Sequence, residues 1–320
     1  MRPMLHSIGQ KTAEETKSKH SSENPRVEYM DCQIIRGNTR LVGLFGYPVA
    51  HSVSPVFQNH AFRKLDLPFV YIPLEVKPEN IQTAVGALKV MGFAGANVTI
   101  PHKRAVMQRC DHVSDISRLT GTVNTLYFDN DRLWGTTTDP QGFYGALRWM
   151  GHEPRGGNIV ILGNGGTART LGFSLALKKI PATLTLVGRN EDRVGGLAKE
   201  ITEKTGFPVQ WTLFSNASLR DRMEPCALCV NCTSLGMHPR ADVSPLEKEM
   251  LHPTMTVVDA IYNPPKTKLL AMAEEKGCTI QNGLRMLLYQ GLASFTYWTG
   301  ANVPEDIFDM EELERLVVHK

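Results

Sequence analysis

The stretch NIVILGNGGTARTLGFSLALKK, residues 158–179, decides the fold of this chain. Its aliphatic residues 159–162 predict a buried strand, its glycines predict a tight turn, and the residues that follow predict a helix. A strand that passes through a glycine turn directly into a helix is typical of a parallel α/β sheet. Further apolar runs follow, separated by helix-type stretches: ATLTLVGRNEDR, VQWTLF, ALCVNCT and TMTVVDAIY. Because such runs indicate strands buried on both faces, residues 139–283 are expected to form a domain built on a parallel sheet.

The first half of the chain alternates in the same way. FVYIPL, GFAGANVTI, TLYFDN and RLWGTTT are typical of strands, and SPVFQNHAFRKL, PENIQTAVGALKVM and HKRAVMQRC of helices. A linking helix is expected next, which Asp139 can cap, with Pro140 at its first position and Gly151 at its end. The apolar segment NGLRMLLYQGLASFTYWTG predicts a last long helix, on which Gln290 could face a cleft. We therefore expect an α/β fold of two domains.

The composition describes a globular chain. It has 320 residues, 42% hydrophobic and 21% charged, and a net charge of only +3 with its basic residues scattered. This argues against a nucleic-acid or membrane-surface partner, and no apolar run reaches the ~18 residues that a membrane helix needs. We expect a cytoplasmic protein with a disordered polar tail over residues 1–34.

The six cysteines do not form a disulfide framework in a chain of this length, and a cytoplasmic protein keeps them reduced. Cys226, Cys229 and Cys232 have the C-x-x-C-x-x-C spacing of an iron–sulfur site. On a buried strand, however, positions three apart face opposite sides, so we expect small core residues and no metal.

The turn GNGGTAR, residues 163–169, has the strand-turn-helix setting of a dinucleotide-binding motif. Glycines there let the backbone approach a pyrophosphate at the helix N-terminus, although a tight turn without a ligand is the alternative. The next strand ends in VGRNEDR, where Arg189 and Arg193 could hold a 2′-phosphate, which favours NADP over NAD. Arg193 could equally be a solvated helix residue.

Polar side chains gather at two points of the first half. Ser52 and Ser54, two apart in an extended stretch, could both reach a polyol or a carboxylate, although Ser54 could also be a helix N-cap. In the segment NVTIPHK, Asn97, Thr99 and Lys103 fall at a strand end and just after it. Lys103 could donate a proton to a ligand if other polar groups converge on it; alone it would be an ordinary surface residue.

Together these segments resemble the shikimate dehydrogenase family over about residues 41–300. The matching motifs, in order, are PVAHSVSP, NVTIPHK, TGTVNTL, GTTTD, GNGGTAR, NCTSLGM, DAIYNPPKTKLL and NGLRMLLYQ. The resemblance implies a substrate domain of residues 35–138 and 284–320 and a Rossmann-type NADP domain of residues 139–283, with a cleft between them. It also implies reduction of 3-dehydroshikimate to shikimate in the synthesis of aromatic amino acids. A quinate/shikimate dehydrogenase that also uses NAD, and a non-catalytic cyclitol-binding regulator, are the alternatives. The chain would be a monomer or a homodimer.

The resemblance also implies roles for individual residues. Lys103 and Asp139 would be the catalytic pair, since the alkoxide left by hydride transfer needs a positively charged proton donor. The substrate would contact this pair and Ser52, Ser54, Asn97, Thr99, Asn124, Tyr262 and Gln290. The cofactor would contact Gly163, Asn164, Gly165, Gly166, Thr167, Arg189, Asn190, Arg193, Thr233, Gly283, Asp115 and Ala260.

Five positions depart from the usual pattern of the family. Thr137 stands where the family has Asn, Pro140 where it has Gly, Thr122 where it has Ala, and Gly188 and Asn190 alter its NRT motif. The first two bracket Asp139 and bear on the choice of substrate, whereas the last two bear on the choice of cofactor.

Overall fold

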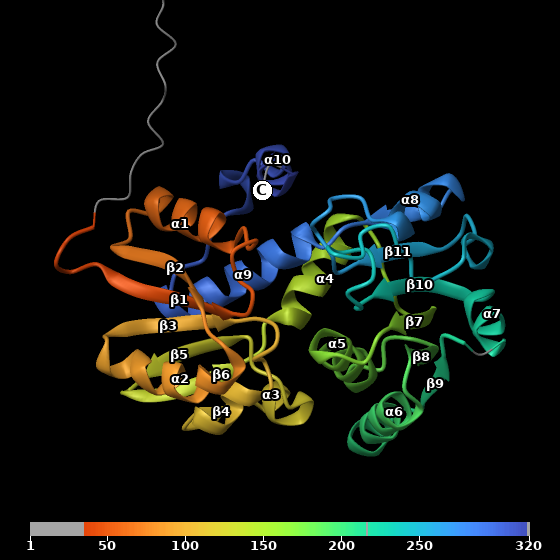
Figure 1. Cartoon of the computed structure of the whole chain (residues 1–320), viewed down its shortest axis with the longest axis horizontal. Helices are drawn as coiled ribbons and strands as arrows, with labels where there is room; N and C mark the ends of the chain where they lie inside the picture. Colours follow the sequence, from red (N-terminus) through yellow and green to blue (C-terminus); the bar gives the residue numbers. More distant parts are fainter. Residues whose placement is uncertain (1–34, 216, 319–320) are drawn as a thin grey trace, which may run out of the picture. The chain divides into compact units, whose positions relative to one another are not determined.

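The computed structural model describes residues 35–215 and 217–318, so the predicted tail of residues 1–34 lies outside the described part. Two six-stranded sheets organise the described residues (Figure 1). The strands of the first sheet lie between residues 40 and 136, and those of the second between residues 158 and 281. The predicted α/β fold is confirmed, while the division into two domains at residues 139 and 283 stays a prediction.

The first sheet has the order β2-β1-β3-β5-β6-β4. Its strands are β1 (Arg40–Gly46), β2 (Phe69–Glu75), β3 (Phe93–Val98), β4 (His112–Val113), β5 (Thr125–Asp129) and β6 (Arg132–Thr136). Strands β1, β2 and β3 are parallel, whereas β5 runs antiparallel to both β3 and β6. Asn130 and Asp131 form the two-residue turn between β5 and β6, and both adopt the positive φ that such a turn requires.

Helices cover both faces of the first sheet (Figure 1). They are α1 (Ser54–Lys64), α2 (Ile81–Val90), α3 (Asp115–Thr120), α9 (Leu284–Thr299) and α10 (Met310–Val318), with 3-10 turns η1 (Pro78–Asn80), η2 (Ala105–Arg109) and η4 (Glu305–Ile307). On one face α2 contributes Val85 and Leu88 to the core; on the other, α1 contributes Phe62 and α9 contributes Phe295 and Trp298. The segment HKRAVMQRC, predicted as a helix, forms only the short turn η2.

The second sheet is parallel throughout, as predicted, in the order β12-β11-β10-β7-β8-β9. Its strands are β7 (Asn158–Leu162), β8 (Thr183–Gly188), β9 (Val209–Leu213), β10 (Cys226–Asn231), β11 (Thr256–Asp259) and β12 (Thr279–Gln281). Helices α4 (Asp139–Trp149), α5 (Gly166–Leu177) and α6 (Glu191–Thr205) cover one face; α7 (Ser218–Met223), η3 (Lys248–Met250) and α8 (Lys268–Glu275) lie on the other. Strand order reverses beside β7, and ligands of such sheets bind at this kind of switch point.

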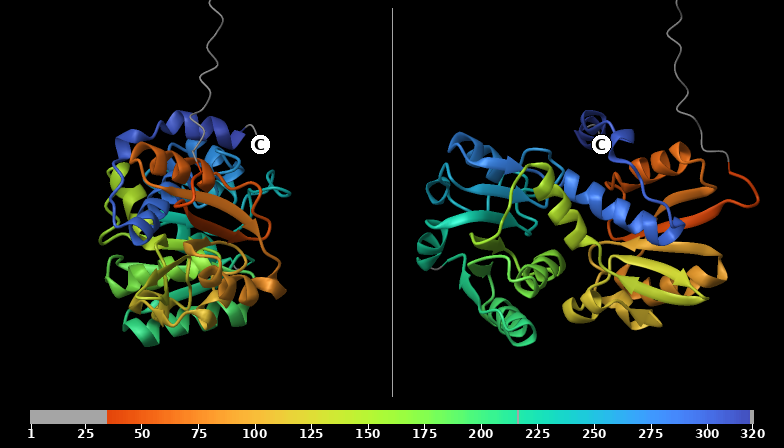
Figure 2. Two further views of the ribbon diagram at one scale, coloured as in Figure 1. Left: turned by 90° about the vertical axis from the view of Figure 1, so that its left-hand side faces the viewer. Right: turned by 180° about the vertical axis from the view of Figure 1, so that it is seen from behind.

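Helix α4 lies across α9 (Figures 1 and 2). Gly142 permits the contact, because a Cβ at this position would lie 2.4 Å from the main-chain oxygen of Met286. The expected cap of α4 is wrong: the N-cap residue is Thr138, without a side-chain bond, and Asp139 is already helical. The carboxylate of Asp139 is engaged elsewhere, as described below.

The prediction that Cys226 and Cys229 face opposite sides of their strand is also wrong. The pairing of β10 with β7 shifts register between Cys226 and Leu228, so both thiols enter the hydrophobic cluster between the sheet and helices α7 and α8. Cys232 packs against the cluster on the opposite face, which includes residues of α4, α5 and α6. Burial raises the pKa of Cys226 to about 12, and the described residues contain no group of three side chains that could hold a metal.

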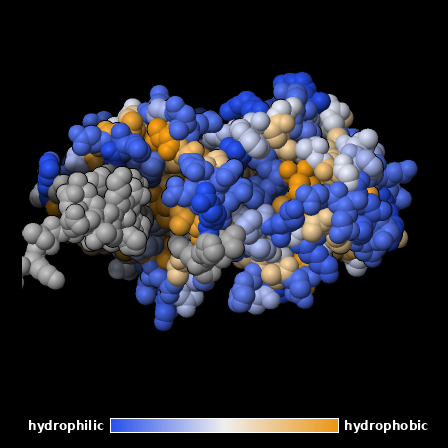
Figure 3. Space-filling view, turned by 90° about the horizontal axis from the view of Figure 1, so that it is seen from above, coloured by the Kyte–Doolittle hydropathy of each residue, from blue (hydrophilic) through white to orange (hydrophobic). Residues whose placement is uncertain are grey.

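Polar side chains cover most of the face seen in Figure 3, and apolar ones appear there in separate small patches. No helix among the described residues is both long and apolar enough to span a membrane.

Candidate active site

Lys103 and Asp139 form an ion pair. Lys103 follows β3 and Asp139 begins α4, and the ammonium nitrogen lies 2.5 Å from the carboxylate Oδ2. The two side chains are 15% and 5% exposed. A largely buried pair of opposite charges interacts more strongly than one in water, and it requires further hydrogen bonds to offset its desolvation.

Asn124 supplies one of these hydrogen bonds and joins the pair to α9. Its Nδ2 donates to Asp139 Oδ1 at 2.8 Å and to Gln290 Oε1 at 3.0 Å. Gln290 in turn donates to the main-chain oxygen of Leu287. The structure therefore brings four of the predicted residues together from four separate segments of the chain.

Asn97 is buried beside this group. Its Nδ2 donates to the main-chain oxygen of Asn124 at 3.1 Å, and its Oδ1 accepts a hydrogen bond from the Tyr71 hydroxyl at 2.8 Å. Burial raises the pKa of the Tyr71 phenol, so this group stays protonated and can donate. Thr99, two residues further, is half-buried and packs its methyl group against Gly46.

Ser52 and Ser54 lie at the start of α1. The helix begins at Ser54 after the N-cap residue Val53, so the alternative that Ser54 is the cap is wrong. The Ser54 hydroxyl lies near the Tyr71 phenol, and Ser52 accepts a hydrogen bond from the Ser54 amide and lies near the Tyr262 hydroxyl. Both serines are therefore close to tyrosine hydroxyls, and that of Tyr71 donates to Asn97.

The glycine turn lies beside Lys103. Gly163 has a φ of 110°, and α5 begins at Gly166, where an added Cβ would lie 3.8 Å from Lys103 Cδ. An added Cβ at Gly165 would meet no described atom within 4 Å. An open glycine turn at the N-terminus of a twelve-residue helix is the setting in which a pyrophosphate binds, so these residues fit a dinucleotide.

Two groups of predicted cofactor residues are in close contact: Thr233 lies against the glycine turn, and Gly283 lies against Ala260. A Cβ at Gly163 would lie 3.3 Å from Thr233 Cγ2, and the Thr233 hydroxyl is held by Asn231 Oδ1 at 2.8 Å. A Cβ at Gly283 would lie 2.2 Å from the main-chain oxygen of Ala260, so only glycine allows this approach.

The predicted 2′-phosphate residues lie after β8. Arg189, Asn190 and Arg193 are exposed, and Asn190 caps α6 by accepting a hydrogen bond from the Arg193 amide at 2.9 Å. Both guanidinium groups therefore reach solvent at the start of a helix. Asn164 and Thr167 are half-buried in the glycine turn.

Asp115 is not brought into this group. Its side chain is 98% exposed, forms an ion pair with Arg118 at 2.9 Å, and borders an open hollow together with Leu119 and Lys204. Its predicted contact with the cofactor has no support in its local geometry.

Three of the departures from the family pattern have distinct surroundings. The Thr122 hydroxyl lies 2.8 Å from the Thr170 hydroxyl of α5, so threonine makes a hydrogen bond here that alanine could not make. A Cβ at Gly188 would lie 2.8 Å from Val194 Cβ, so glycine suits the packing of α6. The Thr137 hydroxyl is buried and makes no hydrogen bond within the described residues.

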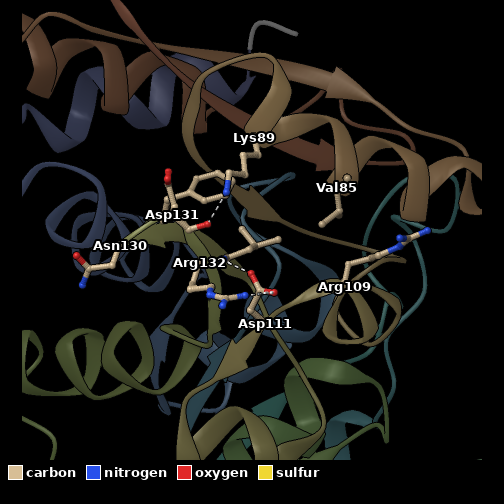
Figure 4. A pocket seen from close by; sticks show the side chains of 10 residues that line it. Val85, Lys89, Arg109, Asp111, Asn130, Asp131 and Arg132 are labelled. Carbon is tan, nitrogen blue, oxygen red and sulfur yellow. Dashed lines mark hydrogen bonds and ion pairs between the residues drawn. The ribbon is translucent and has the colours of Figure 1, made fainter.

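A separate hollow of about 560 Å³ lies beside α2 and the β5–β6 turn (Figure 4). Lys89 donates to the main-chain oxygen of Asp131, Arg132 faces Asp111 at 3.9 Å, and Arg109 points away from both. Because these cations have separate partners and do not converge, we assign no ligand to this hollow.

Comparison with known proteins agrees with the motifs. The family model of the shikimate dehydrogenase substrate binding domain matches residues 44–126, and that of the shikimate 5′-dehydrogenase C-terminal domain matches residues 283–309. The shikimate dehydrogenase (NADP(+)) of Methanopyrus kandleri is 39% identical over 284 residues, which are 88% of this chain and 98% of that protein. The chain belongs to the shikimate dehydrogenase family.

Solved structures of the shikimate dehydrogenase family have the same fold. A shikimate dehydrogenase in complex with NADP+ is 33% identical with a TM-score of 0.80, and the match covers 89% of this chain and 97% of that one. Shikimate 5-dehydrogenase from Listeria monocytogenes, in complex with shikimate and NAD, is 34% identical with a TM-score of 0.79, over 87% and 97% of the two chains.

Sequence reasoning missed the hydroxyl groups that support these residues, namely those of Tyr71, Thr125, Thr138 and Ser294. Tyr71 carried a signal, because a tyrosine inside an apolar strand needs a partner for its hydroxyl. The other three carried none, since small hydroxyl residues are common everywhere in proteins.

Proposed function

We propose that this protein catalyses the reversible NADPH-dependent reduction of 3-dehydroshikimate to shikimate, as a cytoplasmic enzyme of chorismate and aromatic amino-acid synthesis. The observation that carries the proposal is the ion pair of Lys103 and Asp139 beside the glycine turn. A proton donor next to a dinucleotide-binding turn is what reduction of a carbonyl needs. Family membership supports the same activity, since the curated relatives are NADP-dependent shikimate dehydrogenases.

Lys103 would act as the general acid. NADPH, when bound along the glycine turn, supplies a hydride to the carbonyl carbon. The Lys103 ammonium gives a proton to the carbonyl oxygen, and in the reverse direction the amine takes the proton from the alcohol. Asp139 balances the charge of the ammonium and fixes its direction, because its two oxygens are held by Lys103 and Asn124.

The remaining polar residues would bind the substrate. Asn124 and Gln290 present amide groups for ring hydroxyls on the side of Asp139, with Asn97 and Thr99 beside them. Ser52 and Ser54, with Tyr262 nearby, would hold the carboxylate, since hydroxyl donors suit an anion. The residues Arg189 and Arg193 would hold the 2′-phosphate of NADP.

Initial rates with four substrate and cofactor pairs test the proposal. The purified full chain should oxidise shikimate with NADP+ faster than with NAD+, and faster than it oxidises quinate with either cofactor. Comparable rates with quinate or NAD+ would favour the broader quinate/shikimate dehydrogenase. Tight shikimate binding without turnover would instead favour a regulator, although such a protein has no need for a proton donor beside a dinucleotide turn.

A further inference from the structure

Ser294 is a fully buried hydroxyl residue in the middle of α9. Its Oγ lies 2.7 Å from Thr125 Oγ1, 2.9 Å from Asn97 Nδ2 and 3.1 Å from Thr138 Oγ1. It also donates to the main-chain oxygen of Gln290 at 2.9 Å. A single small side chain thus meets polar groups of β3, of β5, of the segment before α4, and of its own helix.

The partners of Ser294 lead directly to the proposed substrate residues. Thr125 Oγ1 donates to Asn124 Oδ1 at 2.8 Å, and Thr138 Oγ1 accepts from Asn124 Nδ2 at 3.0 Å. Asn97 is bonded to Ser294 itself. The Ser294 hydroxyl is therefore one hydrogen bond from Asn97 and two from Asn124.

These contacts form one continuous hydrogen-bonded chain across the site. In order, it runs through Tyr71, Asn97, Ser294, Thr138, Asn124, Asp139 and Lys103. One end is the Tyr71 hydroxyl, which lies near Ser54, and the other is the proposed proton donor. Ser294 stands near the middle, on a different element from either end.

Such a chain can fix the orientation of an amide. An Asn side chain that rotates by half a turn exchanges its donor and its acceptor. The Asn97 amide is held in one orientation because Tyr71 donates to its Oδ1, while the main-chain oxygen of Asn124 and the Ser294 hydroxyl accept from its Nδ2. Without the Ser294 hydroxyl, this buried N–H of Asn97 keeps only a longer contact of 3.4 Å with Thr125 Oγ1, so the amide is held less firmly.

We infer that Ser294 is a positioning residue that sets the orientation of Asn97 and, through Thr125 and Thr138, of Asn124. It acts through these amides and does not touch the reacting atoms. The inference rests on the proposed function, because its kinetic effect concerns the binding of shikimate.

Kinetics of Ser294→Ala test the inference. We expect the KM for shikimate to rise about tenfold, the size of effect expected when a buried donor loses its short hydrogen bond, while the KM for NADP+ stays within about twofold of wild type. Thr296→Ala is the matched control in the same helix, because the Thr296 hydroxyl donates back to the main-chain oxygen of Leu292. The control should leave both KM values unchanged.

Thr138→Val removes a second hydroxyl of the chain and should raise the KM for shikimate in the same way. It also serves if Ser294→Ala does not fold. The inference is overturned if the variants bind shikimate as wild type does, or if the two KM values rise by the same factor, since that result indicates general damage to the fold.

A second measurement separates this inference from the proposed function. Hydrogen exchange of the Asn97 side-chain amide, followed by NMR, should be at least tenfold faster in Ser294→Ala than in wild type or Thr296→Ala. Unchanged exchange overturns the role of Ser294 even in a fully active enzyme. If exchange is faster in Ser294→Ala but the wild-type protein shows no turnover of shikimate, the positioning role is sustained and the proposed function is rejected.

Discussion

Lys103 Nζ lies 2.5 Å from Asp139 Oδ2, although 36 residues separate the two in sequence. The ammonium arrives on the segment after β3 and the carboxylate at the first turn of α4. Asn124 holds the second carboxylate oxygen at 2.8 Å. The pair is thus fixed in direction at both ends, which a proton donor requires if it is to meet one face of a small ligand.

Lys103→Met should remove the proposed proton donor and leave a side chain of similar length. We expect kcat for shikimate oxidation to fall by about 10²- to 10⁴-fold, the range typical of general acid–base catalysis, with little change in the KM for shikimate. Lys89→Met is the control, because Lys89 is an exposed lysine bonded to the main-chain oxygen of Asp131. Steady-state kinetics of both variants test this expectation. A higher KM for shikimate with an unchanged kcat would show that Lys103 only binds the substrate.

Arg193→Ala should weaken the binding of NADP+ and spare that of NAD+. A charge-assisted hydrogen bond to a phosphate contributes about 1.5–3 kcal/mol, so the Kd of NADP+ should rise at least tenfold. The control is Arg220→Ala, an exposed arginine of α7 on the opposite face of the sheet, which pairs with Glu247. Titration calorimetry with both nicotinamide cofactors would contradict the assignment if Arg193→Ala weakened the two equally.

The sequence predicted those parts of the fold that depend on local pattern. The runs that became β7, β8, β10 and β11 are largely apolar, and this is typical of strands covered on both faces. The two-residue strand β4 and the six-residue helix α3 were missed, because such short elements carry too few residues to show a period. The glycine turn was found because its residues are contiguous.

The hydroxyl groups around Ser294 could not be found in this way. Thr125, Thr138 and Ser294 meet only after β5, α4 and α9 have packed, and no spacing in the sequence predicts that contact. The error over the Asp139 cap has the same origin. Its carboxylate binds Lys103 and Asn124, and these tertiary partners override the local preference of an aspartate for the helix start.

Gly142→Ala should disturb the site through the packing of α4 on α9. An added Cβ would lie 2.4 Å from the main-chain oxygen of Met286 and 2.8 Å from Gln290 Cβ, so α9 must shift. Since Gln290 accepts a hydrogen bond from Asn124, we expect a higher KM for shikimate and a free energy of unfolding lower by about 1–3 kcal/mol. Denaturant unfolding and initial rates measure the two effects.

Gly86→Ala is the matched control for Gly142→Ala. Gly86 lies within α2, and a Cβ there would meet no described atom within 4 Å. Alanine at an open helix position should raise the free energy of unfolding by about 0.5–1 kcal/mol and leave KM unchanged. Equal changes of the two alanine variants in the free energy of unfolding and in the KM for shikimate would refute the steric argument.

Arg169 and Glu200 join α5 to α6 through two hydrogen bonds, at 2.5 and 2.7 Å. Arg169 Nε also donates to the main-chain oxygen of Thr120. The hydrogen bonds from Arg169, aided by Lys204, lower the pKa of Glu200 to about 2. The pair therefore favours the folded state when Glu200 is ionised.

Glu200→Gln should lower stability in a manner that depends on pH. Because the folded-state pKa is lowered to about 2 from an ordinary value of 4.5, ionised Glu200 stabilises the fold fully above about pH 4.5. This contribution declines as the pH falls below 4.5 and vanishes near pH 2. At pH 7 we expect a loss of about 1–2 kcal/mol, after allowing for solvent screening of a carboxylate that is 32% exposed. Urea unfolding from pH 7 down to pH 3.5 should show the difference from wild type in the free energy of unfolding become smaller.

Glu203→Gln is the control, because it removes an exposed carboxylate 3.8 Å from Lys199 on the same helix. Its free energy of unfolding should differ from wild type by less than about 0.5 kcal/mol at every pH. If the free energy of unfolding that Glu200→Gln loses stayed constant with pH, the charge of Glu200 would contribute nothing to stability.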